Sequence, residues 1–499
     1  MINLSKSKYC GIWQCPKIAW MKKYKPEECC VSEDLQAKLD TGNEVGDLAM
    51  GLFGDFTEVT VRKDDGNVDL TAMIANTKHE LERGTEVICE ASFDHNGLYC
   101  AVDILKKNGD GRDIYEVKSS THTDKAVYYA DVAYQRYVLT HCGIDVKRVF
   151  IVCINNQYVF EGELDIHKLF RIDEVTDAIK NEERLIEPTV AIAERIVNCP
   201  DEPDIDISER CSKPYGCAFW GYCARNLPSP SVFDIYKLQT DKKIKYYRQG
   251  RADFASLRGD PGIKNANQIR QIEYRLFEKG DYIEKENIRD FLDGLTYPLY
   301  FLDFESVQPA VPRYIGTRPY QQIPFQYSLH CIEREGGEVK HKEYLAEPED
   351  NPLRPIAERL CEDIPMNVCI TAYNKSFECL RLKELAEMFP DLSEHLLNIR
   401  DHMVDLKDPF SKGWYYNRAM GGSFSIKSVL PALYPDDPGL NYHNLDEVHN
   451  GTEAAKTFSE MRRMTPEQRA KTRENMLKYC GLDTLALVKV WEKLKETVM

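Results

Sequence analysis

The sequence lacks any run of about 18 apolar residues, the length that a membrane-spanning helix needs. Residues 1–8 also lack the apolar segment of a secretory signal peptide. We therefore expect a soluble, cytoplasmic protein without a membrane partner. Low-complexity stretches are absent, and 43% hydrophobic and 10% aromatic residues can build true cores. A length of 499 residues predicts two or three domains.

The sequence also lacks an excess of positive charge. A net charge of −16 argues against a protein that coats nucleic acid, because such proteins are basic overall. The charge is compatible with a nucleic-acid enzyme, which can gather acids around metal ions and confine its basic residues to a groove. The net charge therefore does not exclude an enzyme that acts on nucleic acid.

A disulfide framework is not expected either. The 17 cysteines are odd in number and scattered through a long chain, which is typical of thiols and a few metal ligands. Three of them, Cys211, Cys217 and Cys223, lie within thirteen residues. This density indicates a metal site, for which a fourth ligand is needed. Thiolate ligation suits zinc or an iron–sulfur cluster, and the spacing does not choose between them.

Three charged residues lie on neighbouring strands of the N-terminal half. Asp103 falls in an expected strand at 98–105, and Glu116 and Lys118 share one face of the next strand, at 114–118. Two carboxylates can hold a metal ion, and the lysine can orient or deprotonate an attacking water. A salt-bridged strand pair without catalytic function is the alternative. On the helix expected over 124–141, Gln135 is a polar exception among apolar residues and could face a cleft.

Two acids interrupt an apolar run of strand length at 297–306. Asp303 and Glu305 are two residues apart, so both side chains point to one face of the strand. Burying two like charges side by side is costly unless a cation compensates, and a divalent metal is the obvious candidate. Solvent contact at a frayed strand end is the alternative. Further along, Tyr479 and Asp483 are four apart and stack on one face of an expected helix.

The linker at 227–231 separates the two halves. We expect an N-terminal domain at 1–226, a basic helical connector at 227–296 and a C-terminal domain at 297–499. The connector interleaves lysines and arginines with tyrosines, which suits a single strand of nucleic acid or, alternatively, a solvated helix face. The expected fold class is α/β throughout.

Taken together, the C-terminal acids resemble the DnaQ-like, DEDD-type exonuclease superfamily, in the subclass with a Tyr-x-x-x-Asp motif. The resemblance covers roughly 297–499 and implies an RNase H-like mixed sheet, two Mg²⁺ or Mn²⁺ ions and 3′-to-5′ polarity. Glu378 stands where that family usually has aspartate, and Asp405 resembles a downstream structural acid. The implied metal ligands are Asp303, Glu305, Glu378 and Asp483, and Tyr479 would position the attacking water.

The N-terminal half is similar to RecB-like nucleases of the PD-(D/E)xK superfamily, which have a restriction-endonuclease-like fold, in their iron–sulfur subgroup. The resemblance implies that Asp103 and Glu116 bind metal, that Lys118 stabilises the nucleophile or developing charge, and that Gln135 is the downstream glutamine motif. The chain departs in the wide spacing of its first cysteine pair, and in lacking a histidine near 44–47, where Glu44 could substitute. The implied [4Fe–4S] ligands are Cys15, Cys211, Cys217 and Cys223.

The whole arrangement resembles an uncharacterised bacterial family that fuses these two nuclease-like modules. It predicts a metal-dependent nuclease that hydrolyses phosphodiester bonds, with single-stranded DNA favoured as substrate and RNA as the other option. The alternative is a nucleic-acid-binding or assembly protein in which one or both modules are inactive. A zinc site in place of the cluster is a second alternative.

Overall fold

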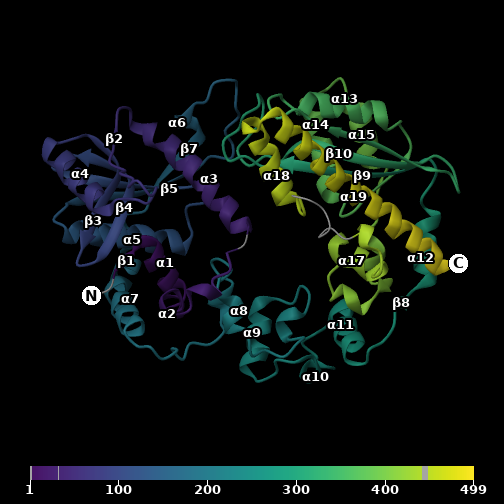
Figure 1. Cartoon of the computed structure of the whole chain (residues 1–499), viewed down its shortest axis with the longest axis horizontal. Helices are drawn as coiled ribbons and strands as arrows, with labels where there is room; N and C mark the ends of the chain where they lie inside the picture. Colours follow the sequence, from purple (N-terminus) through teal and green to yellow (C-terminus); the bar gives the residue numbers. More distant parts are fainter. Residues whose placement is uncertain (1–2, 32, 441–447) are drawn as a thin grey trace. The chain divides into compact units, whose positions relative to one another are not determined.

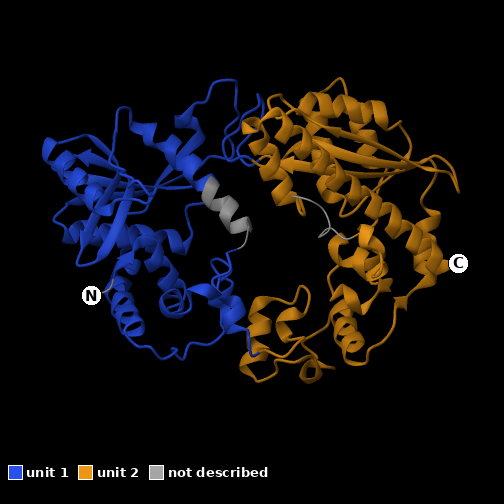
Figure 2. Ribbon diagram, viewed as in Figure 1, with its two compact units in different colours: residues 1–226, 309–320 blue, residues 227–308, 321–499 orange. Residues whose placement is uncertain are grey.

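The computed structural model describes residues 3–31, 33–440 and 448–499, and for 33–40 the backbone alone. The chain is mixed α/β, which confirms the predicted class, and its elements are labelled in Figure 1. It divides into two compact units, coloured in Figure 2. Unit 1 comprises 1–226 and 309–320, and unit 2 comprises 227–308 and 321–499. Among the described residues, no helix has both the length and the apolar character required to cross a membrane.

Unit 1 is built on a seven-stranded sheet in the order β2-β3-β4-β5-β6-β7, with β1 paired to β4. The central pairs β3–β4 and β4–β5 are antiparallel, whereas β5–β6 is parallel, with α5 (Ala126–His141) as the crossover. Alternating buried residues in β4 explain why this run forms a strand with one face on the core. The strands are β1 (Leu4–Ser5), β2 (Thr57–Glu58), β3 (Val87–His95), β4 (Leu98–Asn108), β5 (Gly111–Lys118), β6 (Val146–Ile154) and β7 (Phe170–Glu174).

Helices α1, α2, α5 and α7 pack together in unit 1. Helix α1 begins directly after β1, and its N-cap Ser5 accepts a hydrogen bond from the Lys8 backbone N–H. Tyr9 of α1 stacks on Tyr134 of α5, with ring centroids 4.6 Å apart. Besides α5, the α-helices of unit 1 are α1 (Lys6–Gln14), α2 (Lys17–Tyr24), α3 (Glu33–Ala49), α4 (Leu70–Arg83), α6 (Ile166–Leu169), α7 (Lys180–Val197) and α8 (Trp220–Cys223).

The segment 309–320 belongs to unit 1 although it lies far along the sequence. Ala310 and Val311 are buried in a core cluster that includes β5 and β6 side chains. The backbone of Phe160 donates to Thr317 and accepts from Gly316, at 2.9 and 2.8 Å. These residues connect β9 (Leu299–Val307) to β10 (Ile323–Ile332), so the C-terminal sequence contributes a piece of unit 1.

Unit 2 contains a five-stranded sheet in the order β11-β10-β9-β12-β13. Strands β9, β10 and β11 form the expected antiparallel meander, and β12 and β13 continue in parallel with β9. Pro298 precedes the sheet, as its missing N–H requires. The strands are β9 (Leu299–Val307), β10 (Ile323–Ile332), β11 (Val339–Leu345), β12 (Cys369–Ala372) and β13 (Met403–Asp405).

The long helix α19 (Pro466–Val498) crosses one face of this sheet (Figure 1). Phe301 of β9 meets Trp491 of α19 edge to face, whereas Tyr327 of β10 reaches Asp363 on the opposite side. The other helices of unit 2 are α9 (Thr240–Arg248), α10 (Phe254–Leu257), α11 (Ala266–Leu276), α12 (Lys285–Asp293), α13 (Leu353–Asp363), α14 (Ser376–Met388), α15 (Ser393–Asp401), α16 (Asp408–Ser411), α17 (Ile426–Leu433) and α18 (Gly451–Glu460), and β8 (Tyr282–Ile283) pairs with β14 (Tyr415–Tyr416).

Residues 227–296 group with unit 2. Several basic side chains of this connector serve its own fold. Lys243 donates to the Phe233 carbonyl at 2.7 Å, and Arg251 pairs with Asp260 at 2.5 Å. These contacts favour the structural interpretation for those two residues.

Candidate functional site

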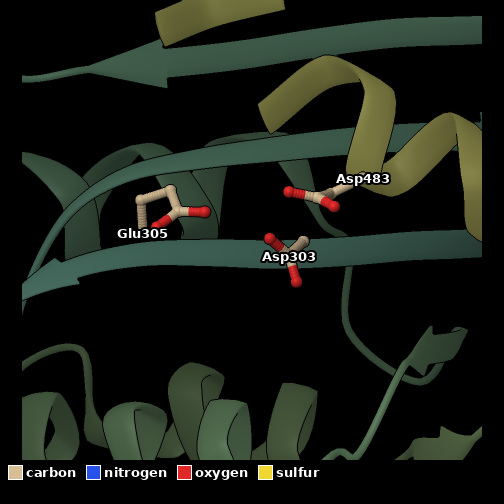
Figure 3. A group of neighbouring side chains, drawn as sticks. All are labelled: Asp303, Glu305 and Asp483. Carbon is tan, nitrogen blue, oxygen red and sulfur yellow. The ribbon is translucent and has the colours of Figure 1, made fainter. Parts of the chain in front are cut away.

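Strand β9 aims two carboxylates at the helix that covers it. The face that carries Phe301 against α19 also carries Asp303 and Glu305, because strand side chains alternate. Asp483 of α19 lies two helical turns before Trp491 and points at the same space. Figure 3 shows the three carboxylates turned toward one another.

These three acids form a compact oxygen-rich group. One carboxylate oxygen from each of Asp303, Glu305 and Asp483 lies within 4.8 Å of the others. Burial raises the pKa of Asp303 well above its usual range, and the charges of Asp483 and Glu305 raise it further. Burial and the Asp483 charge raise the pKa of Glu305 to about 8. The fold therefore holds like charges together at a cost that a divalent cation would remove.

Glu378 lies in the first turn of α14, beside this group. It is 3% exposed, and its Oε2 has no hydrogen-bond partner among the described residues. Burial raises its pKa to about 8. Its charge also raises the pKa values of Asp303 and Glu305, although its carboxylate is not within the 4.8 Å group. A buried carboxylate oxygen without a partner fits an additional cation ligand.

Two further residues border the three acids. The Tyr479 hydroxyl hydrogen-bonds to Glu305 and lowers its pKa. Lys427 of α17 has its Nζ 5.7 Å from the Tyr479 ring centroid, and its charge lowers the pKa of Asp303 and Glu305. Sequence reasoning missed Lys427, because nothing in its local pattern connects it to β9.

Asp405, at the end of β13, has a structural function. Its carboxylate accepts the backbone N–H groups of Asn374, Lys375 and Lys407, at 2.9, 3.2 and 3.0 Å. These bonds fix the turn that leads into α14 and so position Glu378.

The carboxylates of the three-acid group and Glu378 offer oxygen atoms as ligands, and Mg²⁺ and Mn²⁺ prefer oxygen ligands.

The raised pKa values predict how stability depends on pH. The folded state keeps protons on Glu305 and Glu378 up to about pH 8, whereas unfolded glutamates release them near pH 4.5. The unfolded state therefore binds fewer protons in this window, and the free energy of unfolding must fall as pH rises. We expect the melting temperature of chelator-treated protein to decrease between pH 5 and 8. Thermal unfolding across that range measures this, and a flat or rising profile would contradict the site.

In unit 1, the predicted residues also converge. Lys118 Nζ contacts Glu116 at 2.7 Å and Asp131 of α5 at 2.6 Å. Gln135, one turn further along α5, donates to Glu116 at 2.7 Å and to Asp131 at 3.0 Å. Asp103 Oδ2 accepts the Val117 backbone N–H at 2.7 Å. Strands β4 and β5 and helix α5 therefore bring together all four residues that the sequence singled out.

A second lysine completes this cluster. Lys6 Nζ lies 2.8 Å from Glu116 and 3.4 Å from Asp103, so one cation is held between both predicted metal ligands. Burial lowers the Lys6 pKa, but the charges of Asp103, Glu116 and Asp131 and the hydrogen bond to Glu116 together outweigh burial, and the net shift is upward. Gln135 Oε1 is buried without a hydrogen-bond partner among the described residues. The cluster therefore already holds the Lys6 ammonium as a cation, and Gln135 Oε1 is an oxygen atom that could bind a further one.

Sequence reasoning missed three members of the unit 1 cluster. Asp131 could have been found from its spacing of four before Gln135, but Lys6 could not, because it is almost 100 residues from Asp103. Glu90 adopts a positive φ of 59° in β3. Burial, and to a smaller extent the Asp103 charge, raises the pKa of Glu90 to about 7. Glu44, the suggested substitute for a histidine, is exposed and pairs with Arg313 at 3.2 Å.

The four predicted cysteines gather near one another. Burial raises the pKa of Cys217 to about 11, and the neighbouring thiols of Cys211, Cys15 and Cys223 raise it further. No three described cysteine sulfurs lie within 4.8 Å of one another.

The N-terminal helices are attached to the segment that carries the other three cysteines. The Gln14 side chain donates to the carbonyls of Arg210 and Tyr215, at 2.7 and 2.9 Å. Lys17 pairs with Glu202 at 2.7 Å. Cys15, between these two anchors, is therefore held against residues nearly 200 positions later.

Comparison with known proteins gives relatives of unknown function. The family described as Domain of unknown function (DUF2779) matches residues 300–425. The uncharacterized protein UU173 of Ureaplasma parvum serovar 3 (strain ATCC 700970) is 26% identical over 235 residues, which is 42% of this chain and 33% of that protein. The chain thus covers about a third of that relative's length. No solved structure matches this chain.

The matched range begins within β9 and includes Asp303, Glu305 and Glu378. It ends before α19, which supplies Tyr479 and Asp483. The three-acid group therefore combines residues from inside and outside the matched region.

Proposed function

We propose that this chain is a metal-dependent nuclease and that unit 2 removes nucleotides from the 3′ end of a strand. The observation that carries the proposal is the group of Asp303, Glu305 and Asp483, whose oxygens lie within 4.8 Å in a largely buried setting. The mixed sheet with its antiparallel meander supports the RNase H-like, DnaQ-type relationship. The Tyr479–Asp483 pair on α19 supports the tyrosine subclass.

In unit 2, the three acids and Glu378 would hold two Mg²⁺ or Mn²⁺ ions, which would activate water and stabilise the leaving oxygen. Tyr479, hydrogen-bonded to Glu305, would orient the attacking water. A tyrosine with a reference pKa of about 10 is a poor base at neutral pH, so its contribution is positional. Lys427 would place its positive charge beside the phosphate that approaches these acids.

For unit 1 we propose a RecB-like PD-(D/E)xK nuclease module. The convergence of Asp103, Glu116 and Lys118 supports it, as does the attachment of Gln135 to Glu116. Asp103 and Glu116 would hold the metal, and Lys118 would stabilise the nucleophile or the developing charge. The four cysteines would bind a [4Fe–4S] cluster that joins the two ends of the module, with zinc as the alternative.

The rival function is a nucleic-acid-binding or assembly protein with inactive modules. Two departures from the resembled families motivate this rival. Glu378 stands where aspartate is usual, and Glu44, in the region where a histidine is expected, is exposed. To decide, the 499-residue chain is incubated with Mn²⁺ and 5′-labelled single-stranded DNA, duplex DNA or RNA, beside Asp303→Asn and Lys118→Ala variants. The proposal expects stepwise shortening from the 3′ end that Asp303→Asn removes. Binding without cutting by the wild type would instead establish the rival.

The glutamate at position 378 allows a sharper test of unit 2. Because its buried Oε2 has no partner among the described residues, we expect Glu378→Gln to lower 3′-end hydrolysis by about 10²-fold or more, as for a lost metal contact. Removal of this buried carboxyl, whose deprotonation is opposed by burial, should keep or raise the melting temperature without metal. The exposed Glu387, later in α14, gives the control Glu387→Gln, which should match the wild type. Full activity of Glu378→Gln would remove Glu378 from the site.

A further inference from the structure

Lys6 lies in the unit 1 cluster at a place where a metal ion would be expected. It is the first residue of α1, and its side chain contacts Glu116 and Asp103. Leu4 and Ser5, just before it, pair with Leu98 and Tyr99 of β4. The strand pairing therefore fixes the start of α1 beside the β4 acid, and Lys6 has to extend into the cluster.

The carboxylate oxygens of this cluster are already occupied. Glu116 Oε1 accepts from Lys6 at 2.8 Å and from Lys118 at 2.7 Å. Glu116 Oε2 accepts from Lys6 at 3.0 Å and from Gln135 at 2.7 Å. Asp103 uses Oδ2 for the Val117 N–H and Oδ1 for Lys6 at 3.4 Å. A metal bridging Asp103 and Glu116 therefore competes with Lys6 for the same oxygens.

Steric and electrostatic reasons make this competition direct. A Mg²⁺ ion held by Asp103 and Glu116 would need the carboxylate oxygens that now accept hydrogen bonds from the Lys6 ammonium. Two cations that share these oxygens would repel each other strongly. Lys118 differs, because it is shared with Asp131 and lies on the side of α5. Of the two lysines, Lys6 is the one that contacts both predicted metal ligands.

We propose that Lys6 is a resident cation of the unit 1 site, which a divalent metal has to displace before it can bind Asp103 and Glu116. This inference rests on the metal site proposed for unit 1 and is independent of unit 2. The lysine stabilises the metal-free cluster and reduces the fraction of molecules that are competent to bind metal. The apparent metal affinity is lowered by that fraction. Lys6 is thus a positioning residue that sets the metal requirement of the module.

The test measures Mn²⁺ binding rather than cleavage. The 499-residue chain carrying Asp303→Asn and Asp483→Asn, which removes two of the four acids proposed to bind metal in unit 2, is titrated with Mn²⁺ by calorimetry. Adding Lys6→Met is expected to tighten the Mn²⁺ Kd by about tenfold or more, because the competing ammonium is gone. Without metal, the same variant should melt at a lower temperature, because Asp103 and Glu116 are left uncompensated.

Matched variants separate displacement from damage to the fold. Lys8→Met changes an exposed lysine on the same helix and should alter neither Kd nor melting temperature. Lys6→Gln keeps a hydrogen-bond donor and provides a second reading if Lys6→Met folds poorly. An unchanged or weaker Mn²⁺ Kd in both Lys6 variants overturns the inference, as does the absence of Mn²⁺ binding in every protein of the series. Neither result affects unit 2, which is tested separately by 3′-end hydrolysis with Asp303 intact.

Discussion

Replacement of Asp303 by asparagine is expected to reduce 3′-end hydrolysis by about 10³-fold or more while raising the stability of the metal-free protein. The first effect follows because bound metals supply several kcal/mol of transition-state stabilisation, and about 4 kcal/mol corresponds to about 10³-fold in rate. The second follows because Asp303, Glu305 and Asp483 repel one another across less than 4.8 Å. Single-turnover cleavage and thermal unfolding in chelator measure the two effects.

The opposite signs make this prediction specific. A variant that merely damages the fold would lose activity and stability together. Asp436→Asn, at an exposed aspartate of unit 2, should leave both quantities unchanged. Adding Mg²⁺ should raise the melting temperature of the wild type but raise that of Asp303→Asn much less. Equal stabilisation of both proteins by Mg²⁺ would show that the three acids do not bind it.

Replacement of Cys217 by serine is expected to abolish the proposed cysteine metal site and to destabilise unit 1. A cofactor that joins residues nearly 200 positions apart contributes its binding free energy to folding. A loss of at least about 3 kcal/mol would lower the melting temperature of a unit of this size by roughly 6–12 °C. Iron and sulfide analysis of anaerobically purified protein, with its visible absorbance, shows whether the group was present. Calorimetry resolves the unfolding transition of unit 1.

The control for Cys217→Ser is Cys199→Ser. Cys199 is exposed and precedes the same cysteine-rich segment, but it is not one of the three thiols, Cys15, Cys211 and Cys223, that raise the pKa of Cys217. It should keep the iron, the colour and the melting temperature of the wild type. If the wild-type protein is colourless and contains zinc, the four cysteines form a zinc site and not an iron–sulfur cluster. Retention of stability and bound metal by Cys217→Ser would refute the four-cysteine site altogether.

Local patterns were sufficient to predict several of the side chains that converge in the two candidate sites. Period-two alternation placed Asp303 and Glu305 on one strand face, and the spacing of four placed Tyr479 and Asp483 on one helix face. The structure brings three of these acids within 4.8 Å. Strands β4 and β5 were likewise expected where they occur, because their apolar runs are bounded by turn residues.

What the sequence did not predict depends on contacts between distant segments. Lys6 reaches Asp103 only because β1 pairs with β4, and a two-residue strand leaves almost no periodic signal. Lys427 reaches the acids of β9 through the packing of α17 against α19, which no local pattern encodes. The segment 309–320 reads as an ordinary strand connection, yet its apolar residues are buried in unit 1.

Helix α1 connects the carboxylate–lysine cluster of unit 1 with its cysteine group. It begins at Lys6, which touches Glu116, and Cys15 follows its last residue, Gln14. Nine helical residues span about 14 Å. The two groups of side chains that the sequence singled out in unit 1 are therefore attached to opposite ends of one short helix, and a substitution that displaces α1 should disturb both.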